Sequence, residues 1–118
     1  VSVPSHCALM LPAAARLAEQ LAGVTLKPPT LPVIHNVDIT PHADADAIRA
    51  ALKAQLHSPV RWVETVQSLA SRGATRLVEL GPGRVLSGLA KRIDKNLEAF
   101  SVNDQPSLEA ALEAVKNP

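Results

Sequence analysis

The chain has 118 residues, of which 47% are apolar and 19% charged, and its formal net charge is +1. This length supports one core and no more than one domain, and the composition excludes an intrinsically disordered protein. The near-zero charge, with one Trp, one Phe and no Tyr, argues against a nucleic-acid partner, and no signal peptide or apolar run of ~18 residues points to a membrane.

The first half of the chain predicts two helices with a strand between them. Apolar residues recur at helical spacing from residue 13 to residue 24. Residues 32–37 form a short, largely apolar run, as in a strand covered on both faces, and residues 40–42 turn the chain. Asp44 or Asp46 then opens a second helix, in which the apolar stripe consists of Ile48, Ala51, Leu52 and Leu56.

The second half of the chain alternates helices with strands. Ser58 and Pro59 break the preceding helix, since a proline excludes the residue before it from helical geometry. The remaining pattern predicts a helix from residue 62 to residue 73, a strand at 76–80, a helix at 85–93, a strand at 99–102 and a helix at 108–115. We therefore expect an α/β fold, with parallel strands and helices on both faces of the sheet.

A histidine near the N-terminus is the first candidate for chemistry. In residues 3–7 (Val-Pro-Ser-His-Cys), Pro4 keeps Val3 extended and Ser5 can serve as a helix N-cap. His6 is then held at a junction from which a side chain can point into a site. The alternative is a capped helix start with a histidine that is merely solvated or packed.

Gln55 is the second candidate, because it falls on the buried stripe of its helix. It lies seven residues after Ile48 and three after Leu52. A buried amide without a partner costs about 1–3 kcal/mol, so this side chain needs hydrogen bonds. Spacing alone is equally compatible with a core glutamine that bonds to the backbone.

The Gly81-Pro82-Gly83 turn lies between a predicted strand and a predicted helix. Backbone N–H groups there could meet an anion, but the sequence matches neither the dinucleotide nor the P-loop fingerprint. The alternative is a tight turn that lets strand and helix pack closely.

A metal site is a rival use of His6 and Cys7, together with His35, His42 and His57. Neighbouring side chains on a helix point about 100° apart, and neither Cys-x-x-Cys nor His-x-x-x-His spacing occurs. We expect no metal. The single cysteine, Cys7, excludes an internal disulfide and fits a reducing compartment such as the cytoplasm.

Four stretches of the chain resemble malonyl-CoA:acyl-carrier-protein transacylases, the acyltransferases of fatty acid synthesis. They are residues 1–10 (VSVPSHCALM), 36–38 (NVD), 55–62 (QLHSPVRW) and 79–89 (ELGPGRVLSGL). Their order is that of the C-terminal part of such enzymes, and together they extend over nearly the whole chain. The resemblance implies an α/β-hydrolase-like core with a small ferredoxin-like subdomain. We expect residues 1–118, which begin at Val1 rather than Met, to be a C-terminal segment of the large subdomain.

The resemblance also implies an activity and two catalytic residues. The family moves a malonyl group from coenzyme A to acyl carrier protein through a serine acyl-enzyme, with the coenzyme A thioester as substrate and no further cofactor. His6 matches the histidine that acts as general base, and Gln55 matches a residue whose backbone carbonyl accepts the ring N–H.

The residues missing from the chain qualify this function. No Gly-x-Ser-x-Gly elbow occurs, and Ser87 does not qualify because Val85 and Leu89 stand where the glycines should be. The family's nucleophile, oxyanion-hole donors and malonyl-binding arginine all match sequence before Val1. We therefore expect the isolated chain to be inactive and to self-associate through exposed edges. The alternative is a non-catalytic binding or scaffold domain with the same fold.

Three cations assigned to the helix that carries the apolar residues from 85 to 93 suggest a surface for the acidic carrier protein. Arg84, Lys91 and Lys95 are spaced i, i+7 and i+11, on the side opposite the apolar residues. They could steer the carrier's approach. The alternative is a solvated face whose cations offset the helix dipole.

Overall fold

The computed structural model describes residues 3–117, so Val1 and Ser2 of the first matching stretch lie outside the described residues, as does Pro118. The chain forms two compact units that divide between Thr65 and Val66. The prediction of one core is therefore wrong. Four of the six buried apolar residues are alanines, which bury little surface each, so the core of each unit is small. These residues are Ala14 and Ala51 in the first unit, and Val66, Ala90, Leu97 and Ala111 in the second.

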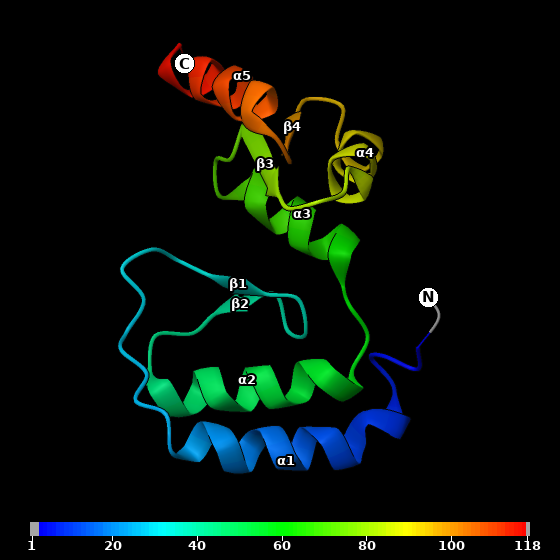
Figure 1. Ribbon diagram of the computed structural model, residues 1–118, viewed down its shortest axis with the longest axis vertical. Helices are drawn as coiled ribbons and strands as arrows, with labels where there is room; N and C mark the ends of the chain where they lie inside the picture. The colour runs from blue at the N-terminus through cyan, green and yellow to red at the C-terminus, as the bar shows by residue number, and fades with distance from the viewer. Residues whose placement is uncertain (1–2, 118) are drawn as a thin grey trace. The chain divides into compact units, whose positions relative to one another are not determined.

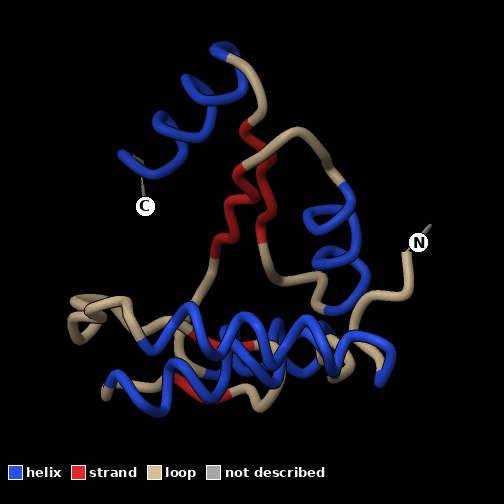
Figure 2. Tube along the Cα trace, turned by 60° about the horizontal axis from the view of Figure 1, so that its bottom comes forward, coloured by secondary structure: helices blue, strands red, loops and turns tan. Residues whose placement is uncertain are grey.

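The first unit is built on two antiparallel helices, α1 (Leu11–Ala22) and α2 (Ala45–His57). They lie side by side in Figures 1 and 2, and the 3₁₀ turn η1 (Ala8–Met10) leads into the first of them. Their most buried residues are Ala14 and Ala51, whose small side chains suit a close approach of two helices. Of the two candidate caps for α2, the structure uses Asp44, whose Oδ1 accepts from the Ala47 N–H at 2.9 Å.

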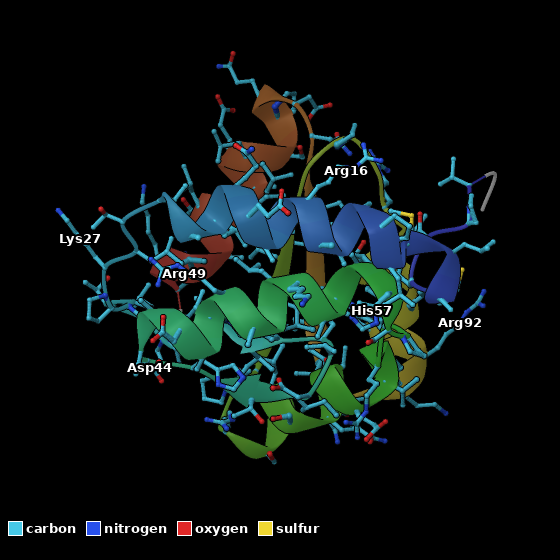
Figure 3. The ribbon with its side chains drawn as sticks, turned by 90° about the horizontal axis from the view of Figure 1, so that it is seen from below. Arg16, Lys27, Asp44, Arg49, His57 and Arg92 are labelled. Atoms are coloured by element: carbon cyan, nitrogen blue, oxygen red, sulfur yellow. The ribbon has the colours of Figure 1, made fainter. Side chains whose placement is uncertain are left out.

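Arg49 fastens α2 to the end of α1. Its Nε donates to the Leu21 carbonyl at 3.0 Å and its Nη2 donates to the Val24 carbonyl at 2.7 Å. Figure 3 shows Arg49 where the end of α1 meets the start of α2. The Leu21 carbonyl also accepts from the Val24 N–H at 3.1 Å, so the guanidinium adds a charge-assisted bond there and offsets the negative end of the helix dipole.

The strand predicted at residues 32–37 is mostly wrong. Only β1 (Ile34–His35) is a strand, and it pairs antiparallel with β2 (Thr40–Pro41), in the place where a turn was expected. The turn lies between them instead, with Ile39 at a φ of 58°. A short apolar run cannot by itself distinguish a buried parallel strand from a hairpin arm.

The connection from α2 into the second unit follows the predicted pattern. Ser58 is extended, with ψ at 152°, and α3 (Trp62–Ser71) crosses the boundary between the units. Gly73, at a φ of 97°, adopts the left-handed geometry that a helix end favours.

The second unit contains a parallel pair of strands with a helix on each face. Strands β3 (Arg76–Leu80) and β4 (Glu98–Val102) pair in parallel from Arg76 with Glu98 to Leu80 with Val102. Helix α4 (Val85–Ile93) connects them and α5 (Gln105–Lys116) follows, on the other side of the strands (Figures 1 and 2). The predicted α/β class is confirmed, and the parallel arrangement is confirmed for this pair alone.

The α5 face of this pair is covered only in part. Helix α5 packs against β4, whereas Val78 and Leu80 on the same face of β3 are 40% and 78% exposed. The opposite face lies against α4, because Glu79 and Ser101 both reach Ser87.

Candidate active site

His6 lies in a turn five residues before α1. The predicted N-cap at Ser5 is wrong, since its N–H bonds to the Val3 carbonyl at 2.8 Å and the helix begins only at Leu11. His6 itself has a φ of 58°, in the left-handed region that non-glycine residues enter at a cost of about 1–2 kcal/mol. A residue in this conformation needs specific partners to hold it there.

The partners of His6 are two consecutive carbonyls in the last turn of α2. Its backbone N–H donates to the Leu56 carbonyl at 3.1 Å, and its ring Nδ1 lies 2.8 Å from the Gln55 carbonyl. Two such bonds stabilise by about 0.5–1.5 kcal/mol each, enough to offset the backbone cost. The end of α2 therefore determines where this histidine sits.

The contact with Gln55 determines which ring nitrogen carries the proton. A carbonyl oxygen only accepts hydrogen bonds, so Nδ1 must donate. The neutral ring then has its lone pair on Nε2, and the side chain is exposed.

Gln55 contributes to this site through its backbone. The side-chain Nε2 of Gln55 is buried, as expected for an amide on the stripe of α2. The hydrogen bonds predicted for this amide nitrogen are absent among residues 3–117. The contact between the His6 ring and the Gln55 carbonyl, which the resemblance implies, is present in the structure.

The stretch 36–38 lies in the β1–β2 hairpin and is hydrogen-bonded to Arg61 and Thr65. The Asn36 side-chain oxygen accepts from Thr65 Oγ1 at 2.9 Å, and its carbonyl accepts from the Arg61 N–H at 3.2 Å. Asp38 accepts from the Thr40 N–H at 3.2 Å and from His42 Nε2 at 2.7 Å. Burial opposes the charge on Asp38, but these hydrogen bonds and the nearby imidazoles hold its pKa below the ordinary value.

Glu79 occupies the helix N-terminus that follows Gly81-Pro82-Gly83. Its carboxylate accepts from the Ser87 N–H at 2.9 Å and from the Leu86 N–H at 3.3 Å. The bond from the Ser87 N–H is the main cause that lowers the pKa of Glu79. The anion at this helix start is therefore the protein's own, and Gly81, at a φ of 140°, makes the turn a tight one.

The three candidate docking cations lie around α4 and β4. Helix α4 ends at Ile93, and Asp94 is extended beyond it, so the placement of Lys95 on this helix is wrong. All three side chains are exposed. Arg84 and Lys91 line a surface cavity of about 430 Å³, and Lys91 and Lys95 line a second one of about 470 Å³, both bordered by Phe100.

Neither a metal site nor a membrane span stands out in the described part of the chain. No group of three or more His, Cys, Asp or Glu side chains among residues 3–117 is placed to hold a metal ion. No helix there is both long and apolar enough to cross a bilayer.

Two hydrogen-bonding residues, one in each unit, were missed by the sequence reasoning. Leu56 supplies the second carbonyl to His6, and Glu79 caps α4. A signal for Glu79 exists, since it is an acidic residue inside an apolar strand. No signal for Leu56 exists, because its contribution is a backbone atom 50 positions along the chain.

The chain is similar over nearly all its length to known transacylases. It is 53% identical over 112 residues to the malonyl CoA-acyl carrier protein transacylase of Salmonella typhimurium, covering 95% of this chain and 36% of that protein. A malonyl-transacylase solved in complex with its type II PKS acyl-carrier protein is 54% identical, with a TM-score of 0.92 over 97% of this chain and 37% of its own. An acyl carrier protein S-malonyltransferase from Vibrio cholerae is 53% identical, with a TM-score of 0.89 over 94% of this chain and 36% of its own. The chain thus spans little more than a third of the length of these relatives. No family model matches it.

Proposed function

This chain is a homologue of the malonyl CoA-acyl carrier protein transacylases and matches their C-terminal portion, and on that premise we propose that it supplies the general base of malonyl transfer from coenzyme A to acyl carrier protein. The observation that carries the proposal is the 2.8 Å contact between His6 Nδ1 and the Gln55 carbonyl. It leaves Nε2 free to accept a proton.

The reaction uses Nε2 of His6 twice. A serine hydroxyl attacks the thioester carbonyl while its proton passes to Nε2, and the coenzyme A thiol leaves with the proton that Nε2 returns. The carrier thiol then gives its proton to Nε2 and attacks the serine ester, and the proton returns to the serine oxygen. At each of these stages the Gln55 carbonyl keeps the ring oriented through its contact with Nδ1.

The serine is proposed to lie in sequence outside residues 1–118. No Gly-x-Ser-x-Gly elbow occurs in the chain, which spans little more than a third of the length of its relatives. In this proposal the chain forms part of an α/β-hydrolase-like core, in the large subdomain, and the small ferredoxin-like subdomain is separate from it.

Incubation with malonyl-CoA tests this division of labour. The complete enzyme is expected to gain one malonyl group on a serine and to pass it to the carrier, whereas residues 1–118 alone are expected to show no stable adduct by intact-mass measurement. A stoichiometric ester on the isolated chain would refute the external nucleophile. Absence of transfer by the complete enzyme would favour the binding or scaffold alternative.

The proposed partner surface consists of Arg84, Lys91 and Lys95. The carrier proteins of this pathway are expected to be acidic, and these cations border two adjoining cavities. Replacing Lys91 and Lys95 with glutamate is expected to raise KM for the carrier roughly three- to tenfold, more at low salt, because steering by exposed charges is screened by ions. Steady-state transfer to the carrier at two salt concentrations measures the effect.

A small thiol acceptor and a distant charge provide the controls. Transfer to a small thiol is expected to be unchanged in the double variant, since such an acceptor has no acidic surface. Lys53→Glu, an exposed reversal on α2, is expected to leave KM for the carrier near that of the parent. Equal effects on both acceptors would reduce the three cations to an ordinary solvated surface.

A further inference from the structure

The Gln55 carbonyl is available to His6 because residue 59 is a proline. In a continuing helix the carbonyl of residue 55 would accept from the N–H of residue 59. Pro59 has no N–H, so the carbonyl has no helical donor. His6 Nδ1 takes the vacant position at 2.8 Å.

Pro59 also turns the chain away from the helix axis. Ser58 is extended, with φ at −119° and ψ at 152°, as expected for a residue before a proline. The N–H of Val60 is thereby carried away from the Leu56 carbonyl, which accepts from the His6 N–H at 3.1 Å instead. Pro59 itself is exposed, so packing does not account for its position.

We propose that Pro59 is a positioning residue for the base, because it keeps the Gln55 carbonyl open and thereby fixes the proton of His6 on Nδ1. The catalytic half of this inference rests on the proposed function of His6. The structural half rests only on the geometry of the α2 end. Pro59 acts through Gln55 and is not expected to touch substrate.

The test compares Pro59→Ala with the parent in the complete enzyme. Alanine supplies an N–H and favours helix, so the N–H of residue 59 can compete for the Gln55 carbonyl. Nitrogen NMR of histidine-labelled enzyme, with His6 assigned by its loss in His6→Gln, is expected to show Nδ1–H in the parent and a larger Nε2–H fraction in the variant. The kcat for malonyl transfer is expected to fall about tenfold, less than the ~10²–10⁴-fold contribution of a general base, with KM for malonyl-CoA unchanged.

Two further variants make the outcome decisive. Pro29→Ala changes an exposed loop proline and is expected to leave both the tautomer and kcat unchanged. Pro59→Gly supplies the N–H without favouring helix and replaces the alanine variant if that one unfolds; its expected effect is smaller but in the same direction.

The two readouts separate the two claims. An unchanged His6 tautomer in both Pro59 variants would overturn the positioning role, whatever the activity. A changed tautomer with parental turnover would support the positioning role and refute the catalytic role of His6. A changed tautomer with reduced kcat supports both.

Discussion

Replacing His6 with alanine is expected to lower kcat for malonyl transfer by ~10²–10⁴-fold in the complete enzyme, because the variant lacks the proposed general base. KM for malonyl-CoA is expected to change little, since in the proposed role the ring acts on protons rather than on substrate binding. The measurement is steady-state transfer from malonyl-CoA to the carrier.

His57→Ala provides the matched control. His57 lies at the end of α2, the helix whose carbonyls accept from His6, and makes no side-chain hydrogen bond within the described part of the chain. Its variant is expected to turn over near the parental rate. If His6→Ala also turned over near the parental rate, with an unchanged free energy of unfolding, His6 would not be the base.

Replacing Arg49 with methionine is expected to lower the free energy of unfolding of the first unit by about 2–3 kcal/mol. Two charge-assisted hydrogen bonds to carbonyls at the end of α1 are lost, and the side chain is only 26% exposed. The ion pair with Asp46 adds little, because Asp46 is 95% exposed. Chemical denaturation followed by fluorescence of Trp62, the single tryptophan, reports the change.

Two further arginine variants separate charge from geometry. Arg49→Lys keeps the charge but loses the planar fork, so it is expected to recover only part of the loss. Arg16→Met alters an exposed arginine on α1, which Figure 3 shows pointing away from α2, and is expected to stay within about 0.5 kcal/mol of the parent. Equal losses for Arg16 and Arg49 would mean that the two carbonyl bonds contribute nothing specific.

Elements whose ends are marked by proline or glycine were predictable from the sequence, whereas elements that depend on strand pairing were not. Pro59, Gly73 and Gly81 mark the element ends, and the apolar repeats between such residues give helices and strands close to those observed. The strand prediction for residues 32–37 is wrong for most of that run, because the partner strand β2 is only two residues long and contains a proline. The spacing of apolar residues along the chain does not show which segment a strand pairs with.

The site was predictable only through resemblance. His6 and Gln55 are 49 positions apart, and their contact depends on where α2 ends and on a left-handed backbone at His6. Neither property follows from spacing. Ser5 was misjudged because a serine before an apolar run fits a helix cap, yet a turn and a 3₁₀ segment intervene before α1.

The Glu79 cap makes the start of α4 sensitive to acid. The pKa of Glu79 is lower in the fold than its ordinary value of 4.5, so the cap contributes fully above that value and is lost as the pH falls through the lowered pKa. Protonation weakens the bonds to the Leu86 and Ser87 N–H groups, which frees the turn that begins at Arg84. The carboxylates of an acidic carrier are protonated below about pH 4, so acid well below pH 4.5 would weaken both sides of the proposed encounter together.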